Sequence, residues 1–500
     1  MSFEIWPLHL NLHQQLLVVC CILLSLPNSI MPFTVEISDS NNSSVSSSSS
    51  PLIDGISTKQ DSAITDSQEQ QAVYDIMKAT GNDWAIDIPD VCRGRWHGIE
   101  CMPDKHNVYH IVSLSFGALS DDTAFPTCDP TRSSISPSIT KLPHLKTLFF
   151  YRCFTYNPQP IPSFLGLLGP SLQTLVLREN GHIGPIPNQL GNLTRLKVLD
   201  LHKNNLNSSI PLSLNRITGL RSLDLSANKL TDSIPDLIFP SLNVLDLSMN
   251  RLSGPIPSTL WDCHSLIKFD VSRNRLTGPI PDKLKGLNDL MLMDLSFNRI
   301  QGPFPISLKK LNSLQALILK GNPIGSTIVP NDLFDGMNGL MILIMSNMNL
   351  QGPIPESLGK LPNLRVLHLD GNHLNGSIPK SFRELRSLSE LRLNDNGLIG
   401  PVPFERDMVW RMKRKLRLYN NLGLCYDSNS GIGDSVDSDF GISLCESSSP
   451  GSVRTVHHVL DTQKPGPTTT FMDHVSISSD STLTRSLGLV TFLLFSLVFL

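Results

Sequence analysis

The chain has 500 residues, which allows about two or three domains and a large buried core. Its 41 basic and 44 acidic residues leave a net charge of −3, so composition disfavours nucleic acid or an anionic membrane surface as the main partner. The informative residues are instead the recurring leucine, proline, glycine and asparagine.

The N-terminal residues indicate export. An apolar run from Leu16 to Leu26 is followed by small and polar residues, and its length fits a signal peptide over residues 1–29 better than a membrane span. Residues 30–69 are rich in Ser, Asp and Asn and are expected to be disordered, because they offer little apolar surface to bury. Cys20 and Cys21 fall inside the signal peptide, so seven of the nine cysteines remain, and this odd number predicts one free thiol.

Residues 70–130 have the pattern of an N-terminal cap. A helical apolar stripe is formed by Ala72, Val73, Ile76 and Met77. Trp84 then precedes the segment Cys92–Cys101, which contains Trp96, Gly98 and Ile99. This arrangement resembles the cap of plant leucine-rich-repeat ectodomains, and the resemblance implies a disulfide between Cys92 and Cys101.

Two strands are expected after this cap segment. Ile111, Val112, Leu114 and Phe116 predict the first, and Leu145, Leu148 and Phe150 predict an irregular second one. Cys128 and Cys153 lie between and beside these strands, and we expect them to pair with each other.

A motif with a period near 24 residues runs through residues 131–403. Ten repeats share one equivalent apolar position, held by Leu175, Leu199, Leu223, Leu245, Phe269, Met293, Leu317, Leu343, Leu367 and Leu391. Five residues later comes an asparagine, replaced once by Met348: Asn180, Asn204, Asn228, Asn250, Asn274, Asn298, Asn322, Asn372 and Asn396. This is the LxxLxLxxN signature of leucine-rich repeats, whose LxL segments form short strands with inward leucines. The stacked strands predict a parallel sheet on a concave face.

The second half of each repeat reads LxGxIPxxL, as from Leu252 to Leu260, and predicts the opposite, convex wall. Glycine permits a tight turn there, and proline cannot donate to a central ladder. Ser208, Asp232 and Ser326 replace the glycine in three repeats. The GxIP form resembles the plant-specific class of repeat found in receptor kinases, receptor-like proteins and polygalacturonase inhibitors. We therefore predict an α/β solenoid, a right-handed leucine-rich-repeat superhelix of plant-specific type with disulfide-capped ends.

Residues 404–445 are expected to form the C-terminal cap, clipped by a Cys425–Cys445 disulfide, which leaves Cys263 as the free thiol. Five basic residues, Arg411, Lys413, Arg414, Lys415 and Arg417, precede Cys425. They are interpreted as the solvated face of an extracellular cap helix, because no apolar span separates them from the repeats.

The remaining residues indicate a tether. Residues 446–485 are polar and are interpreted as a disordered stalk, and residues 486–500 form a C-terminal hydrophobic segment. Fifteen residues are short for a helix that must cross about 30 Å of hydrocarbon. A short single-pass anchor and a lipid-anchor signal both fit this segment.

Three stretches carry a closer resemblance: ATGNDWAIDIPDVCRGRWHGIECMPD (79–104), SLSFGALSDDTAFPTCDP (113–130) and GPVPFERDMVWRMKRKLRLYNNLGLC (400–425). With the repeats, they resemble the plant leucine-rich-repeat receptor-like proteins that act in the stomatal lineage, over about residues 70–425. The resemblance implies a plasma-membrane receptor without a kinase that limits stomatal lineage divisions. It also implies partnership with ERECTA-family receptor kinases in perceiving secreted, cysteine-rich epidermal patterning factor peptides.

The sequence offers no support for catalysis. We find no clustered carboxylate pair, no zinc-ligand spacing and no nucleophile elbow, and the fourteen histidines are scattered, so neither an enzyme nor a metal or cofactor is expected. An apoplastic inhibitor of wall-degrading enzymes is the alternative function, since the repeat class fits it. Such an inhibitor needs no C-terminal anchor, so detergent-dependent extraction would separate the two interpretations.

Candidate partner-binding residues are those that depart from the generic repeat on the concave face. One position after each anchor, the middle repeats carry Asp200, Asp224, Asp246, Asp270 and Asp294, which are common in this repeat class and are interpreted as a solvated face. The same column then changes to Ile318, Ile344, His368 and Arg392, where two adjacent aliphatic side chains predict an exposed apolar step. A second group of departures comprises Val176, Arg178, Glu179, His202 and Lys203.

Five sequons predict N-glycosylation, at Asn41, Asn42, Asn192, Asn207 and Asn375. Asn207 and Asn375 both lie eight residues after their repeat anchor, so they are expected on one lateral edge that faces away from the partner.

Overall fold

The computed structural model describes residues 64–94, 97–117, 125–325, 328–421, 423–427 and 441–445. The predicted signal peptide, most of the serine-rich segment with Asn41 and Asn42, the stalk, the C-terminal hydrophobic segment and Trp96 lie outside these residues. Within the described ranges, no helix combines the length and the apolar character needed to cross a bilayer.

The N-terminal cap begins with β1 (Ile64–Thr65) and α2 (Ser67–Ala79). Asp66 caps the helix, because its side chain accepts the backbone N–H groups of Gln68 and Glu69, which have no partner inside the helix. The predicted apolar stripe is buried: Ala72, Val73, Ile76 and Met77 face the core. A short 3-10 helix, η1 (Asp83–Asp87), follows.

An antiparallel hairpin joins this cap to the repeats. Strand β2 (Ile99–Pro103) pairs with β3 (Val108–Phe116), the strand that the sequence predicts. The disulfide Cys92–Cys101 links the segment before the hairpin to β2. Strand β3 also pairs in parallel with β1 at the edge of the long sheet and, on its other side, with β4 (Thr147–Tyr151).

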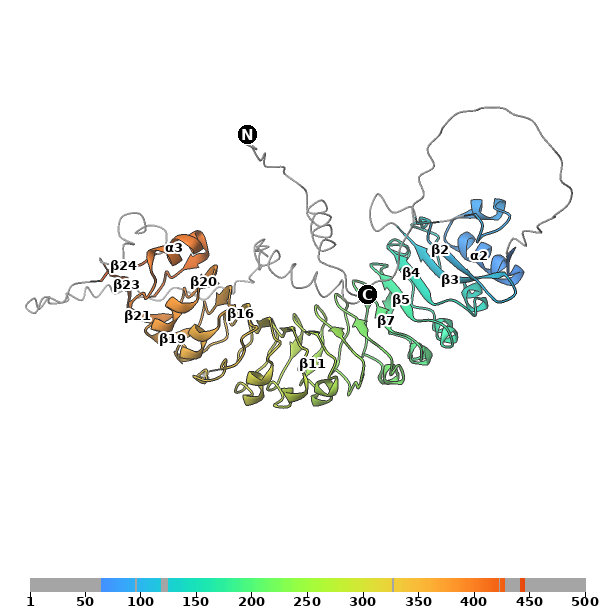
Figure 1. The fold of residues 1–500 in the computed structure, drawn as a ribbon. Helices are drawn as coiled ribbons and strands as arrows, with labels where there is room; N and C mark the ends of the chain where they lie inside the picture. Colours follow the sequence, from blue (N-terminus) through green and yellow to red (C-terminus); the bar gives the residue numbers. More distant parts are fainter. Residues whose placement is uncertain are drawn as a thin grey trace, which may run out of the picture. The chain divides into compact units, whose positions relative to one another are not determined.

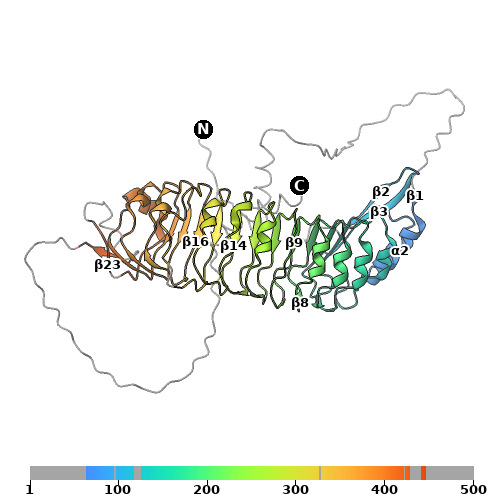
Figure 2. The same ribbon diagram turned by 90° about the horizontal axis from the view of Figure 1, so that it is seen from below.

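The long sheet has 15 strands and follows chain order from β3 onward. Its later strands are β5 (Thr174–Arg178), β7 (Val198–Asp200), β9 (Ser222–Asp224), β10 (Val244–Asp246), β12 (Lys268–Asp270), β14 (Leu292–Asp294), β15 (Ala316–Ile318), β16 (Ile342–Ile344), β18 (Val366–His368), β20 (Glu390–Arg392) and β22 (Leu416–Arg417). All ten predicted anchors lie in these strands, and neighbouring anchors pair in register, as Leu199 does with Leu223. The repeats lie side by side in both views, with the long sheet on the inner side of their curve (Figure 1, Figure 2). The predicted fold class is confirmed.

The repeat asparagines bond to the preceding repeat. Asn228 is typical: its Nδ2 donates to the Leu201 carbonyl at 2.9 Å, and its Oδ1 accepts the Leu206 N–H at 3.0 Å. Each such side chain therefore satisfies backbone groups where the strand ends and the ladder stops. At the exception, the backbone N–H of Met348 donates instead to Asn372 of the next repeat, at 2.9 Å.

The other wall of the solenoid combines short strands with 3-10 helices. The strands form three small parallel sheets: β6 (Ile183–Gly184) with β8 (Asn205–Leu206), β11 (Ser253–Gly254) with β13 (Arg275–Leu276), and β17 (Gln351–Pro353), β19 (His373–Gly376), β21 (Gly397–Pro401), β23 (Gly423–Tyr426) and β24 (Ser443–Leu444). The 3-10 helices are η2 (Pro137–Lys141), η3 (Ser163–Leu168), η4 (Asn188–Asn192), η5 (Leu212–Arg216), η6 (Ser258–Asp262), η7 (Leu284–Gly286), η8 (Ile306–Lys310), η9 (Glu356–Lys360) and η10 (Lys380–Glu384). The proline of the GxIP motif stands just before several of them, for example Pro257 before η6, where its fixed φ and missing N–H do no harm.

The glycine of this motif adopts a left-handed backbone, with φ of 77° at Gly254. Ser208 and Asp232 replace it yet keep φ at 66° and 65°, so the turn geometry survives at some cost in strain.

The C-terminal cap differs from its sequence interpretation. Helix α3 (Arg406–Met412) ends before most of the basic residues, and Lys413–Lys415 form the 3-10 helix η11. Lys413 has a φ of 46°, which stops the helix, and Arg417 joins the long sheet in β22. The five basic residues therefore do not share one helix face. The disulfide Cys425–Cys445 lies in this cap.

Candidate binding surface

Five aspartates form a single column on the long sheet. Each is the last residue of its strand, and they pair in register from β7 to β14: Asp200, Asp224, Asp246, Asp270 and Asp294. Adjacent strands lie about 4.8 Å apart, so each aspartate carboxylate lies close to the carboxylate of the next strand. We call these residues the acid column.

One oxygen of each carboxylate accepts a backbone N–H two residues later in the chain. Asp224 Oδ1 accepts the N–H of Ser226 at 3.0 Å, and Asp294 Oδ1 accepts that of Ser296 at 2.8 Å, as in an Asx turn. The other three aspartates accept the N–H two residues later in the same way. The interpretation of the column as only a solvated face is thus incomplete, because these side chains also close the strand ends.

Burial and mutual repulsion disfavour ionisation of most of the column. Burial, followed by the nearby Asp224 charge, raises the pKa of Asp200 to about 7. Burial chiefly raises the pKa of Asp294 to about 6, and burial with the charges of Asp246 and Asp294 raises the pKa of Asp270 well above its ordinary value. The column therefore holds less negative charge at neutral pH than five free carboxylates would, and added positive charge would be stabilised there.

Asp246 is the exception within the column. Burial opposes its ionisation, but Lys268 Nζ lies 2.7 Å from Asp246 Oδ2 and lowers the pKa of this carboxyl. Among the described residues, no lysine or arginine is ion-paired with Asp270 or Asp294. These two carboxylates are consequently the ones best placed to meet a cationic group from a partner.

The N-terminal group of predicted partner residues is brought together. Arg178 lies between two aspartates, with Nε 3.3 Å from Asp200 Oδ2 and Nη2 3.5 Å from Asp224 Oδ2. His202 Nδ1 is 2.7 Å from the Ser226 hydroxyl. In this group Val176 is buried on β5.

Glu179 and Lys203 stand at the rim of the same patch. Glu179 Oε2 accepts from Lys203 Nζ at 3.0 Å and pairs with Arg152 Nη2 at 2.9 Å. Arg152 and Lys203 are both largely exposed, at 59% of their side-chain surface, so this charged rim is open to a partner. Arg152 was missed from sequence because it precedes the regular repeats.

The prediction of an exposed apolar step is wrong. Ile318 is 3% exposed and Ile344 is fully buried. They pair in register across β15 and β16 and pack into a second apolar cluster with Leu292, Ala316, Ile342 and Val366. The cause is geometric. Ile318 and Ile344, like Ala316 and Ile342, are paired on adjacent strands of the same inner face, and these closely spaced side chains cover one another.

His368 and Arg392 are also buried, and they share one carboxylate. Glu390 Oε1 lies 2.9 Å from His368 Nε2 and 2.9 Å from Arg392 Nη2. Burial works against ionisation of Glu390, but His368 and Arg392 outweigh it and hold the pKa of Glu390 below its ordinary value. Glu390 was missed from sequence because it stands one position before the anchor, outside the column compared.

The predicted modification sites are found as follows. Asn192, Asn207 and Asn375 are exposed, and Asn207 and Asn375 occupy matching places at or beside β8 and β19, away from the long sheet. The third disulfide joins Cys128 to Cys153. Cys263 is free and buried, and burial raises the pKa of its thiol.

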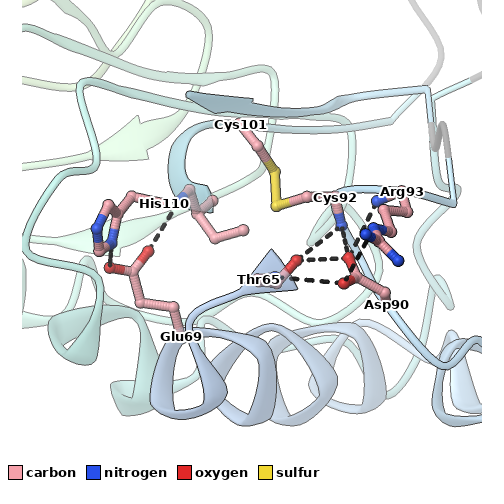
Figure 3. The surroundings of a disulfide bond; sticks show 8 residues. Thr65, Glu69, Asp90, Cys92, Arg93, Cys101 and His110 are labelled. Carbon is pink, nitrogen blue, oxygen red and sulfur yellow. Dashed lines mark hydrogen bonds and ion pairs between the residues drawn. A yellow bond between two sulfur atoms is a disulfide. The ribbon is translucent and has the colours of Figure 1, made fainter. Parts of the chain in front are cut away.

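One cluster able to hold a metal ion lies in the N-terminal cap, outside these surfaces. Glu69, His110 and His144 each offer a ligand atom, and the three atoms lie within 4.8 Å of one another. Figure 3 shows the Glu69 carboxylate beside the His110 ring. The residues are far apart in sequence, so spacing alone could not reveal the cluster.

The repeats match known families. One leucine rich repeat family matches residues 265–324 and 338–398, and a second matches residues 195–217, 219–240 and 241–263. The chain is 68% identical over 478 residues to Protein TOO MANY MOUTHS of Arabidopsis thaliana, and this match covers 94% of each of the two chains. It is 36% identical over 139 residues to Receptor like protein 29 of Arabidopsis thaliana, covering 27% of this chain and 29% of that protein.

A solved receptor has a similar fold. The leucine-rich-repeat ectodomain of the receptor kinase GASSHO1/SCHENGEN3 from Arabidopsis thaliana, in complex with CASPARIAN STRIP INTEGRITY FACTOR 2, matches with a TM-score of 0.56 and 26% identity. The match covers 71% of this chain and 47% of that one, so the chain spans about half the length of that ectodomain.

Proposed function

Because the chain belongs to the family of plant leucine-rich-repeat receptor-like proteins that includes TOO MANY MOUTHS, we propose that it is a cell-surface co-receptor for secreted peptides. Its partners in this proposal are ERECTA-family receptor kinases, and its ligands are cysteine-rich epidermal patterning factor peptides. The outcome of this binding is a limit on stomatal lineage divisions.

The observation that carries the proposal is the relation to TOO MANY MOUTHS, which extends over nearly the whole chain. The fold of a receptor ectodomain solved with CASPARIAN STRIP INTEGRITY FACTOR 2 adds general support for ligand binding by this architecture.

The concave face suits binding rather than bond chemistry. Its acid column offers a row of carboxylates, of which Asp270 and Asp294 are the best placed for cations of a partner. The exposed rim of Arg152 and Lys203, beside Glu179, offers the opposite charge at the N-terminal end. A partner with a basic segment and an acidic end would be complementary to both.

The test is co-purification of the secreted chain with ERECTA-family ectodomains, with and without an epidermal patterning peptide. We expect a complex that a double variant, Asp270→Ala with Asp294→Ala, weakens. The proposal is contradicted if the wild-type protein forms no complex with the kinase ectodomains and binds no peptide. Inhibition of a polygalacturonase by the purified chain would favour the wall-enzyme inhibitor instead.

Attachment to the plasma membrane is part of the proposal, through the hydrophobic segment at residues 486–500. Extraction from plant membranes should therefore require detergent. Release by a phospholipase that cleaves lipid anchors would distinguish a lipid anchor from a short membrane span.

A further inference from the structure

We propose that Glu69, His110 and His144 form a binding site for a divalent transition-metal ion of the zinc type. The three side chains come from different elements: Glu69 from α2, His110 from β3, and His144 from the turn that leads into β4. Two imidazoles and one carboxylate are a donor set that zinc commonly takes in proteins.

The separations of Glu69 from the two histidines are close to those around a single ion, and all three ligand atoms lie within 4.8 Å of one another. Glu69 Oε1 lies 2.7 Å from His110 Nδ1 and 3.3 Å from His144 Nδ1. Donors bound to one tetrahedral zinc at about 2.0–2.1 Å lie about 3.3 Å from each other. Glu69 and His144 already have that separation, and His110 needs to withdraw by only about half an ångström.

The carboxylate is held in place for such a role. Glu69 is 2% exposed, and its second oxygen accepts the backbone N–H of Ile111 at 2.7 Å. An acidic side chain this deeply buried is costly unless cations or donors surround it. Here two ring nitrogens converge on the same oxygen, Oε1, so one metal ion could replace two separate hydrogen bonds.

The surroundings supply an outer carboxylate and an access route. Asp104 Oδ2 lies 3.8 Å from His110 Nε2, on the ring edge opposite Glu69, where metal-bound histidines usually meet a carboxylate. The His144 side chain is 51% exposed, so an ion and a water at the fourth position can reach the site.

The ion would join the cap helix α2 to strand β3 and to the turn that leads into β4. Binding only to the folded protein stabilises it by mass action, so zinc should raise the unfolding temperature of the cap end of the solenoid. This effect needs neither a receptor kinase nor a peptide, and its test is therefore independent of the proposed function.

The experiment uses the full secreted chain, stripped with a chelator and titrated with ZnCl₂ by calorimetry. We expect one zinc per chain and a rise in unfolding temperature that the chelator reverses. Cobalt substituted for zinc should give the intense visible absorption of a tetrahedral ion. His144→Ala and Glu69→Gln should each weaken zinc binding by at least about 10-fold.

His144→Ala and Glu69→Gln should both leave the protein folded. His144 is half exposed, and the glutamine carbonyl can still accept the Ile111 N–H. His373→Ala, which removes an exposed histidine from β19, is the matched control and should bind zinc like the wild type. The proposal is overturned if the wild type binds no zinc, or if His144→Ala and Glu69→Gln, folded by circular dichroism, bind it as tightly as His373→Ala does.

Discussion

Lys268 Nζ lies 2.7 Å from Asp246 Oδ2 at the centre of the acid column, and both side chains are mostly buried. Neighbouring strands place Asp224 and Asp270 on either side of Asp246. The lysine pKa is raised, because the attraction of Asp246 and Asp270 outweighs the burial that opposes its charge. Lys268 therefore offsets the repulsion that the repeated aspartates create.

Replacing Lys268 with methionine should destabilise the solenoid by about 3 kcal/mol, since a buried carboxylate then loses its partner. Chemical denaturation of the secreted protein measures this change. Lys229→Met, which removes an exposed lysine, is the control and should cost less than about 0.5 kcal/mol. Equal stability of the two variants would mean that Lys268 does not hold the column together.

The acid column should also make stability depend on pH. The Asp200 pKa is raised to about 7 in the folded chain, so folding favours its protonated form. Its contribution to stability is complete below the unfolded pKa near 4 and is lost as the pH rises through about 7. Asp200→Asn removes this loss while keeping an oxygen for the His202 N–H.

We therefore expect the unfolding free energy of Asp200→Asn to exceed that of the wild type by about 1–3 kcal/mol at pH 7.5, with a higher unfolding temperature. At pH 4 the two proteins should unfold at the same temperature. Calorimetric melting at the two pH values measures the difference. A variant that is less stable than the wild type at pH 7.5 would show that the ion pair with Arg178 outweighs the burial of Asp200.

The burial of Ile318 and Ile344 means that substitutions at these two positions test packing and not partner binding. Because Ile344 is fully buried beside Ile318, an aspartate at either position would unfold the protein rather than probe a surface. Ile344→Ala should cost about 2–4 kcal/mol in unfolding free energy. Ile306, 69% exposed, is the matched control, and Ile306→Ala should have almost no effect on thermal unfolding. Similar melting of both alanine variants would refute the packing described for Ile344.

Local repetition explains why the fold was predictable. Each anchor leucine and repeat asparagine acts within one repeat and its neighbour, so a pattern such as Leu199 with Asn204 already specifies a strand and its closing turn. The hairpin of β2 and β3 interrupts this regularity, and its second strand alone was visible as an apolar run.

The surface was harder to predict, because exposure depends on neighbouring strands. Ile318 has the outward position of its repeat, and the apolar cluster that it forms with neighbours such as Ile344 and Ile342 makes it inaccessible. Glu69 and His144 are separated by 75 residues and meet only because the cap helix packs against the start of the sheet. Such contacts are set by packing between elements, which a repeat pattern does not encode.

The cap disulfides should matter more for secretion than the free thiol. Cys92–Cys101 links the segment before the hairpin to β2, at the N-terminal end of the solenoid, where no preceding repeat covers the core. Cys92→Ser should lose about 2–4 kcal/mol of stability and reduce the secreted yield. Cys263→Ser, at a buried free cysteine, should reduce it less, and immunoblotting of culture medium compares the two. Equal secretion of Cys92→Ser and wild type would contradict this order.

The last prediction separates the edge that carries the predicted glycosylation sites from the proposed binding face. Asn207 and Asn375 are exposed and lie by the short strands β8 and β19, whereas the acid column belongs to the long sheet. Sugars at these two sites should therefore not obstruct a partner on the concave face. Ser209→Ala with Ser377→Ala erases both sequons without changing either asparagine.

A new N-glycosylation sequon can place a sugar on the concave face. Asp294 is followed by Leu295 and Ser296, so Asp294→Asn creates a new sequon in the acid column. The double variant Asp294→Asn with Ser296→Ala makes the same charge change without a sequon and is the matched control. The mass of the secreted protein shows which variants carry the sugar.

We expect Ser209→Ala with Ser377→Ala to bind the kinase ectodomain and peptide like the wild type. Glycosylated Asp294→Asn should lose binding to well below the level of its unglycosylated control, because a sugar is too bulky for a buried interface. Surface plasmon resonance on the purified proteins measures both affinities. If the new sugar leaves both affinities unchanged while removal of the sequons at Asn207 and Asn375 abolishes binding, then the partner binds the lateral edge. In that case the acid column serves only to close the strand ends, through bonds such as that from the Ser296 N–H to Asp294.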